Sequence, residues 1–544
     1  MKKIIPFLLL LICSSVSAQL KVGNIDLDFG ETITSSDGDV IKIAGEKDNT
    51  IFALARKKKK FFLQTFDAST KAFKSSSLLS FDKKNGGKLS IEDLAIVGEK
   101  IFLMVSYYDK KAKTNNFLAK EIVGNKIVKT TNVLSVEVES KKKRGSFVFT
   151  SSYDEFNYLI AHVGINSRKE QLKYTVTLLD DNLTEVLNDS YEIVFEEKNR
   201  QLFDFSDVQV NEHGDVLIAT TESFRDKKKK TSVNNITIHS YLVKDNYKKK
   251  VTNITLEGKR ALNCSLIETD NVLHAIGFYS ALKKSGKAEY TVEGIYDISL
   301  NYNTGEILKQ TFNDFTVDVK TKLIGERRAK KGKDLKPFYQ NIAFVERDNG
   351  GVIVLSEFKL VQVGRTGGIG PLSVTPITYI TNEIIVTALK KDGTLDWSNV
   401  IPKEQQVTVS ELGFSLSFGG SSGGVSVSAS AYFPLALLGS GPEYLSAIPI
   451  YHNGQLTVLV NDDPKNIGVT DIDDVKKVRN INKMIPVAFS FNEQTGELKR
   501  TDPEDFEKKQ IVLRPSTHYR KSQNTFLIYG GNKKGDALGE LKIK

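Results

Sequence analysis

The sequence is poor in the residues that usually mark a catalytic or metal-binding centre. Its 544 residues include two cysteines, one tryptophan and six histidines. The histidines are scattered, without an HExxH pair, so no zinc site is indicated. No G-x-S-x-G motif occurs, and the GGSSGG segment at 419–424 lacks the flanking strand and helix of a nucleophile elbow. We therefore predict no catalytic residue, no metal ligand and no cofactor.

Long apolar runs are also missing, which argues against a membrane-spanning helix. The chain opens with two lysines, an apolar run that ends at Ile12, and small residues up to Ala18. This run is far shorter than the ~20 residues that a spanning helix needs, and it has the pattern of a secretory signal peptide. We predict a signal peptide at residues 1–18 and no transmembrane span. A lipid anchor on Cys13 is the alternative, which the bulky Ile12 disfavours.

The scarcity of cysteine excludes a disulfide framework. Removal of residues 1–18 would leave Cys264 as the only cysteine, so the mature chain would form no intramolecular disulfide. Cys264 lies in the apolar segment ALNCSLIE, where we expect a buried, inert thiol because no histidine lies near it in the sequence.

Short β-strand patterns fill the rest of the chain. One hairpin motif recurs in SLNYNTGEILKQ (299–310), TALKKDGTLDWS (387–398) and SFNEQTGELKRT (490–501). A second hairpin precedes it, as in FVERDNGGVIVLSEF and PIYHNGQLTVLVND. Together they give four-stranded units, of which Lys336 to Pro402 is the clearest. The units start near Ser36, Lys88, Gly145, Gln201, Arg260, Lys336, Glu443 and Ser516.

This spacing of about 50 to 60 residues is typical of propeller blades. We predict an all-β fold, a β-propeller of eight four-stranded antiparallel blades. Seven blades, or a stack of separate β-sandwiches, are the alternatives. The last unit supplies only three strands, so we expect the N-terminal strand LKVGNIDLDF (20–29) to complete it and close the ring. Residues 19–544 would then form a single domain with an uncharged hairpin inserted at about 412–442.

The turn GTLDW at 393–397, with NTGEILK and QTGELK, resembles the turns of quinoprotein-type (PQQ-like) propeller repeats, in which Trp follows Gly by four residues. Only one of the three turns carries the Trp, so the resemblance does not imply a quinone cofactor. The segments RDNGGVIVLSEF, NEIIVTALKKDGTLDWSNVIPK and GQLTVLVNDDPKN resemble uncharacterised exported propeller-like proteins of Gram-negative bacteria. This second resemblance implies no known activity. We interpret Trp397 as a residue that packs between blades.

The lysine runs of the sequence are predicted to lie at one end of the blades. In an antiparallel sheet, alternate turns lie at opposite ends, so the turns between strands two and three share one face with the links between blades. The basic runs fall in these positions. They either keep the protein soluble or attract polyanions, such as lipopolysaccharide, an acidic polysaccharide or an acidic envelope protein. Nucleic acid is disfavoured because no aromatic residues interleave with the lysines. The candidate polyanion-binding residues are Lys57, Lys58, Lys59, Lys60, Lys227, Lys228, Lys229, Lys230, Arg327 and Arg328.

The segment from Leu412 to Pro442 contains no charged residue, in a chain that is 26% charged. Its apolar residues alternate with serine, which predicts a hairpin with one apolar face. It either folds as a flap over the disc or its channel, or it contacts a partner or a membrane surface. The candidate contact residues are Phe414, Leu416, Phe418, Val425, Val427 and Phe433.

These patterns favour an exported binding or scaffold propeller, a monomer in the periplasm or at the outer membrane. The alternative is a propeller hydrolase or lyase that acts on glycans or peptides. Carboxylates or histidines that converge at the mouth of the channel would favour the enzyme.

Overall fold

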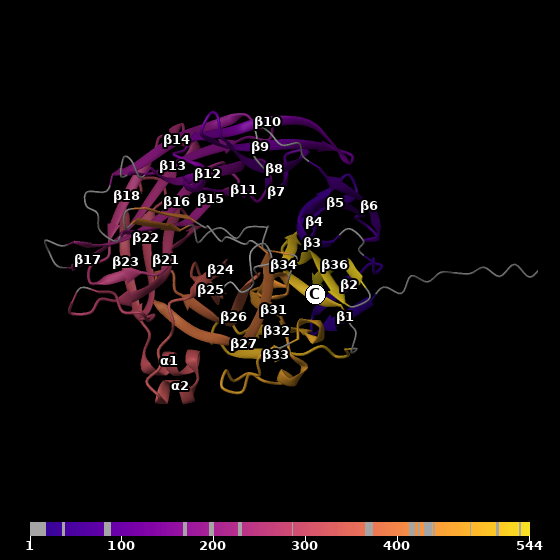
Figure 1. The fold of residues 1–544 in the computed structure, drawn as a ribbon. Coiled ribbons are helices and arrows are strands. Elements are labelled where there is room, and N and C mark those ends of the chain that lie inside the picture. Colours follow the sequence, from indigo (N-terminus) through magenta and orange to yellow (C-terminus); the bar gives the residue numbers. More distant parts are fainter. Residues whose placement is uncertain are drawn as a thin grey trace, which may run out of the picture.

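The computed structural model describes residues 18–34, 38–80, 89–166, 171–194, 201–226, 231–285, 287–364, 374–412, 419–422, 425–428, 438, 441–478, 480–506, 511–532 and 535–544. Within these ranges the chain forms a ring of eight sheets, each built on an antiparallel arrangement of strands and placed around a common axis (Figure 1). The prediction of an eight-bladed β-propeller is therefore confirmed. No helix in the described part of the chain is both long enough and apolar enough to span a membrane.

The first four blades follow one another along the chain. Blade 1 comprises β3 (Asp39–Lys47), β4 (Thr50–Lys57), β5 (Lys60–Asp67) and β6 (Phe73–Leu79). Blade 2 comprises β7 (Ser90–Val97), β8 (Lys100–Asp109), β9 (Thr114–Val123) and β10 (Lys126–Glu137). Blade 3 comprises β11 (Ser146–Ser151), β12 (Tyr158–Asn166), β13 (Gln171–Leu179) and β14 (Glu185–Val194). Blade 4 comprises β15 (Gln201–Val210), β16 (Val216–Asp226), β17 (Thr231–Tyr241) and β18 (Lys250–Thr255).

The remaining blades carry the irregular features. In blade 5 the first strand is split into β19 (Lys259–Ala261) and β20 (Ser265–Thr269), which pair with β21 (Val272–Ala281), followed by β22 (Gly294–Asn301) and β23 (Ile307–Asp314). Blade 6 comprises β24 (Tyr339–Glu346), β25 (Val352–Val363), β26 (Val374–Leu389) and β27 (Leu395–Leu412). Blade 7 comprises β30 (Ala447–His452), β31 (Gln455–Asp462), β32 (Ile485–Phe491) and β33 (Leu498–Thr501).

Blade 8 joins the two ends of the chain. It contains β34 (Val512–Arg520), β35 (Thr525–Asn532) and β36 (Gly535–Ile543), and β36 pairs with β2 (Ile25–Phe29). The N-terminal segment therefore closes the ring, as predicted. It does so as a hairpin of two strands, because Gly23 at φ 60° turns β1 (Ala18–Val22) back along β2. The sheet thus has five strands.

The hydrophobic core lies between neighbouring blades. One buried cluster combines Ile353 and Leu355 of blade 6 with Val458, Val487 and Phe489 of blade 7. Another joins the β1–β2 hairpin and blade 8 to blade 7. Middle strands pack on both faces, and some of them, such as β8 and β21, are therefore mostly apolar along their length. Interblade packing takes the place of a disulfide framework.

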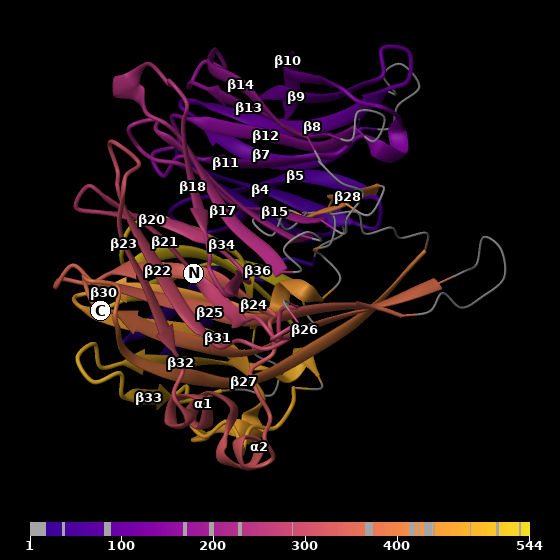
Figure 2. The same ribbon diagram turned by 90° about the vertical axis from the view of Figure 1, so that its left-hand side faces the viewer.

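The two ends of the ring differ in their connections. We call the end with the turns between strands two and three, and with the links between blades, the lysine end. In Figure 2 the long arms of β26 and β27 project from this end. The links include η1 (Lys141–Lys143), α1 (Val317–Ile324) and α2 (Glu326–Lys330). The opposite end carries the turns between strands one and two and between strands three and four, including η2 (Val243–Asp245).

Candidate functional site

Exposed lysines gather at the lysine end of blades 1 to 3. Lys57–Lys60 form the tip between β4 and β5, and Lys110, Lys111 and Lys113 form the tip between β8 and β9. The three lysines of η1 lie in the link between blades 2 and 3 and are also exposed. The topology therefore brings these predicted basic turns to the same end of adjacent blades.

Other predicted basic residues do not lie on blades 1 to 3. Arg327 and Arg328 are exposed on α2, in the link between blades 5 and 6. Arg327 Nε lies 3.9 Å from Asp473, which also accepts a hydrogen bond from the Arg327 backbone amide at 3.0 Å. Lys227–Lys230 lie outside the described residues. Arg260, near which the fifth unit was predicted to start, lies within strand β19.

The turns at the opposite end contain both acidic and basic residues. The motifs DAST, DDNL and NEHGD occur in its turns, but so do Lys244, Lys248 and Lys390. Several lysines there are paired: Lys250 Nζ lies 2.5 Å from Asp245, and Lys249 Nζ lies 2.6 Å from Asp189. The two ends therefore differ mainly in that exposed lysines are clustered at the lysine end. Both ends carry charges of both signs.

Part of the uncharged insertion lies against blade 4. Strands β28 (Gly419–Ser422) and β29 (Val425–Ser428) form a hairpin, and β29 runs parallel to β15, the strand of blade 4 nearest the axis. Val425 and Val427 belong to β29 and are opposite Gln201 and Phe203. Phe414, Leu416, Phe418 and Phe433 lie outside the described residues.

The end of this insertion crosses between blades at the lysine end. Leu438 packs in the core shared by blades 1 and 2, and its carbonyl accepts a hydrogen bond from Arg56 Nη1 at 2.9 Å. The short helix η5 (Pro442–Tyr444) follows and contacts β34 of blade 8. Asn461 of blade 7 donates a hydrogen bond to the Tyr444 carbonyl at 2.9 Å. The insertion therefore contacts blades on different sides of the axis.

Two buried charged clusters hold η5 and the residues after it. In the first, Glu357 of blade 6 is fully buried and accepts hydrogen bonds from Lys403 and Ser446, the latter at 2.8 Å. Lys359 Nζ lies 3.1 Å from the same carboxylate. Because both Glu357 and Lys403 are removed from water, each depends on the other for charge compensation.

The second cluster lies between blades 8 and 1. Arg514 Nη2 lies 2.9 Å from Asp536 and 3.2 Å from Asp39, and the rings of Tyr444 and Tyr529 lie about its guanidinium. Burial raises the pKa of Asp536 to about 7; the Arg514 guanidinium opposes this shift and the Asp39 carboxylate adds to it. One cation therefore serves two carboxylates at the seam where the ring closes.

At the opposite end, a turn of blade 3 reaches blade 8. The Tyr519 hydroxyl donates to Glu155 Oε1 at 2.9 Å, across a separation of 364 residues. The Tyr519 ring packs close to Gly45 of blade 1. A Cβ added at Gly45 would lie 3.3 Å from the tyrosine ring and 2.8 Å from Ile96. Burial raises the pKa of Glu155, while the Tyr519 hydrogen bond and nearby Lys42 oppose the shift.

Lys42 and Asp93 extend this cluster along the strands nearest the axis. Asp93 is buried, pairs with Lys42 and accepts a hydrogen bond from the Tyr158 hydroxyl at 3.1 Å. Carboxylates of blades 2 and 3 thus converge near the axis, but partners already occupy both oxygens of Asp93. This arrangement suits a rigid polar scaffold better than a free acid and base.

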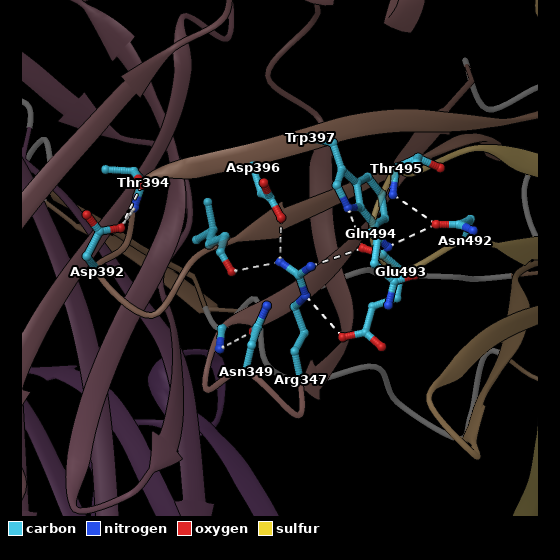
Figure 3. A network of polar contacts seen from close by, with 12 residues as sticks. Arg347, Asn349, Asp392, Thr394, Asp396, Trp397, Asn492, Glu493, Gln494 and Thr495 are labelled. Atoms are coloured by element: carbon cyan, nitrogen blue, oxygen red, sulfur yellow. Dashed lines mark hydrogen bonds and ion pairs between the residues drawn. The ribbon is translucent and has the colours of Figure 1, made fainter.

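Trp397 packs between blades 6 and 7, as predicted. It is 9% exposed, its ring is stacked on Phe491 with centroids 6.1 Å apart, and Nε1 donates to the Glu493 carbonyl at 2.8 Å. Figure 3 shows that Arg347 reaches the same turn; its Nη2 donates to the Glu493 carbonyl at 3.0 Å and its Nε to Oε1 at 3.3 Å. Gly496 makes room for the indole, because a Cβ there would lie 2.4 Å from it.

The recurring hairpin turns share one docking contact. Thr252 Oγ1 donates to the Gly305 carbonyl at 2.8 Å, Asn313 Nδ2 to Gly393 at 2.9 Å, and Asn399 Nδ2 to Gly496 at 2.7 Å. In each case the donor belongs to the outer strand of the preceding blade. The glycine repeat seen in the sequence therefore marks an interblade contact that is common to blades 5, 6 and 7.

The cysteine and two of the histidines noted in the sequence are buried. Cys264 is a buried free thiol, as predicted, and burial raises its pKa to about 12. His162 and His239 are buried, and burial lowers the pKa of each to about 4. Among the described residues, no group of three or more His, Cys, Asp or Glu side chains is arranged to hold a metal ion.

The strand pairing defines the chain as an eight-bladed β-propeller. No family model and no curated protein matches the sequence. Among solved structures, it is similar to the WD40 domain of SCAP from fission yeast, at 9% identity over 95% of this chain and 98% of that one, with a TM-score of 0.35. The Dos1 propeller is 8% identical over 95% of each chain, with a TM-score of 0.38. The polysaccharide lyase Uly1 is 12% identical over 80% of this chain and 89% of that one, with a TM-score of 0.35.

Sequence reasoning missed the polar clusters near the axis. Glu357 and Arg514 each interrupt an otherwise apolar strand, VIVLSEFKL and IVLRPS, and this interruption was the available signal. The partners of these residues come from other strands and blades, so local periodicity did not identify them.

Proposed function

We propose that the protein is an exported binding propeller of the bacterial envelope, a monomer whose lysine end holds an anionic polymer. The observation that supports this function most directly is the grouping of exposed lysines at one end of blades 1 to 3. Phosphate, carboxylate or sulfate groups spaced along a polymer would meet several of these tips at once. Lipopolysaccharide and acidic polysaccharide share this chemistry.

The physical reason is long-range attraction rather than a shaped pocket. Separate ammonium groups on short rigid turns create a positive potential that raises the local concentration of a polyanion. Each contact is weak and is screened over roughly 8 Å at physiological salt. Several contacts on one polymer combine because the later ones are intramolecular.

Retention on heparin and lipopolysaccharide resins tests this proposal. We expect K58Q/K59Q and K110Q/K111Q to elute at lower salt than the wild type, and the combined variant at lower salt still. K390Q/K391Q is the matched control, because it removes the same charge from an exposed turn at the opposite end. The two resins distinguish a lipid-linked phosphate from a polysaccharide. Equal elution of the combined variant and the wild type on both resins would refute the proposal.

Export is a separate part of the proposal. The N-terminal lysines, the apolar run and the Val-Ser-Ala segment support removal of residues 1–18 and a periplasmic or outer-membrane location. Sequencing of the protein recovered from an envelope fraction should show Gln19 as the first residue. A chain that begins at Met1 and stays in the cytoplasm would contradict this part.

A further inference from the structure

The turn Ser152–Asn157 of blade 3 presents two aromatic side chains at the end opposite the lysines. Tyr153 is 60% exposed and Phe156 is 50% exposed. The turn lies where blades 2, 3 and 8 meet, since the Gly98 amide donates to the Glu155 carbonyl at 2.8 Å and Tyr519 donates to the Glu155 carboxylate. These aromatic rings therefore stand above a junction of blades and not at the outer rim.

The turn is held in one conformation by its own hydrogen bonds. The Ser152 amide donates to the Asn157 carbonyl at 2.9 Å, and the Asn157 amide donates to Ser152 Oγ at 3.0 Å. Asp154 accepts from the Phe156 amide at 3.2 Å, and Glu155 adopts φ 63°. Because the backbone is already ordered, a ligand that stacks on these rings would not have to immobilise the loop.

The charged groups around the turn largely compensate one another. Lys42 pairs with Asp93, Lys47 Nζ lies 3.0 Å from Glu99, and Lys521 Nζ lies 2.6 Å from Glu46. The Arg520 guanidinium lies 5.8 Å from the centre of the Tyr153 ring, on the same side of the molecule as Asp154 and Glu155. The surface thus offers hydrogen-bond donors and acceptors beside the rings without a strong net charge.

We propose that this aromatic turn is a binding site for a neutral oligosaccharide. A pyranose ring has about the area of one aromatic side chain, so it can lie against the Tyr153 or Phe156 ring while its hydroxyls bond to neighbouring charged groups. Asp154, Glu155 and Arg520 supply those groups. Asp154 is exposed between the two aromatic residues and Arg520 lies beside Tyr153, and these polar flanks suit a sugar better than the apolar centre of a protein interface. The site is independent of the polyanion surface.

Calorimetric titration with chitohexaose, maltohexaose and xylohexaose tests the proposal on the full chain. We expect at least one of the three to bind, and Y153A/F156A to weaken that binding by about tenfold or more, equivalent to about 1.4 kcal/mol. Y290A is the matched control, because Tyr290 is 63% exposed in the connection between β21 and β22 at the lysine end. It should leave oligosaccharide affinity unchanged.

Two further measurements distinguish a loss of sugar binding from unfolding and from a loss of polyanion binding. Both aromatic rings are exposed, so the variant should melt at the wild-type temperature, and F156Y should retain affinity. Heparin retention should stay the same in Y153A/F156A. The proposal is overturned if none of the three oligosaccharides binds, if Y153A/F156A binds them as the wild type does, or if the turn captures a protein in place of a sugar.

Discussion

Replacement of Trp397 should show how much one interblade contact stabilises the ring. Trp397→Ala removes a side chain that is 9% exposed and leaves a cavity beside Phe491 and Gly496. Large-to-small changes of this kind cost about 3–5 kcal/mol. Trp397→Phe keeps most of the ring packing and loses one hydrogen bond to a carbonyl that Arg347 also contacts. We expect it to cost only about 1–2 kcal/mol.

Urea unfolding followed by far-ultraviolet circular dichroism would measure both costs. Val317→Ala serves as the control, because Val317 is 78% exposed and its loss should change the unfolding free energy by less than about 0.5 kcal/mol. Trp397 is the only tryptophan, so fluorescence excited at a wavelength that tyrosine does not absorb reports on this contact alone. A cost for Trp397→Ala that is no larger than that of the control would refute the interblade role.

Three further predictions concern the polar clusters. Lys403→Met should cost about 3–5 kcal/mol because it leaves the Glu357 carboxylate buried with a weaker counter-charge, whereas methionine at both positions should recover most of the loss; urea unfolding of the two variants would show this. The pKa of Asp536 is higher in the folded chain, at about 7, than its ordinary value of 3.8. The folded state therefore binds more protons at this group, and the contribution of Asp536 to stability should fall as pH rises from about 4 to about 7, by at most about 1.4 kcal/mol per pH unit. The lowered pKa values of His162 and His239 act in the opposite direction over the same range. Unfolding curves across that range should therefore show that the stability of the wild type relative to Asp536→Asn decreases as pH rises; a constant difference would contradict the assignment. Gly45→Ala should cost about 1–3 kcal/mol, because φ at Gly45 is 142° and the added Cβ would lie 2.8 Å from Ile96 and 3.3 Å from Tyr519; the shift in melting temperature relative to the wild type would measure this cost.

Most of the fold is predictable from local repeats in the sequence. The glycine turns at 305, 393 and 496 are recognisable because each repeats the same strand–turn–strand pattern, and each turn docks on the preceding blade. The placement of Lys57–Lys60 and Lys110–Lys113 at one end follows from strand alternation alone.

Contacts across the ring were not predictable in the same way. Tyr519 and Glu155 are 364 residues apart, and their meeting depends on ring closure and on the missing side chain at Gly45. Glu357 stands out in the sequence only as a break in an apolar strand, and its pairing with Lys403 does not show there, because burial is a property of the assembled blades. The helices α1 and α2 were also missed, since they are short and stand in a single link between blades.

The salt dependence of polyanion binding tests the central claim most directly. The dissociation constant of the wild type for a heparin-derived oligosaccharide should rise steeply with salt concentration, as expected when bound lysines displace counterions. The K58Q/K59Q/K110Q/K111Q variant should bind more weakly and with a shallower salt dependence, while K390Q/K391Q should match the wild type. A salt-independent affinity, or identical slopes for all three proteins, would contradict the assignment of the lysine end as the binding surface.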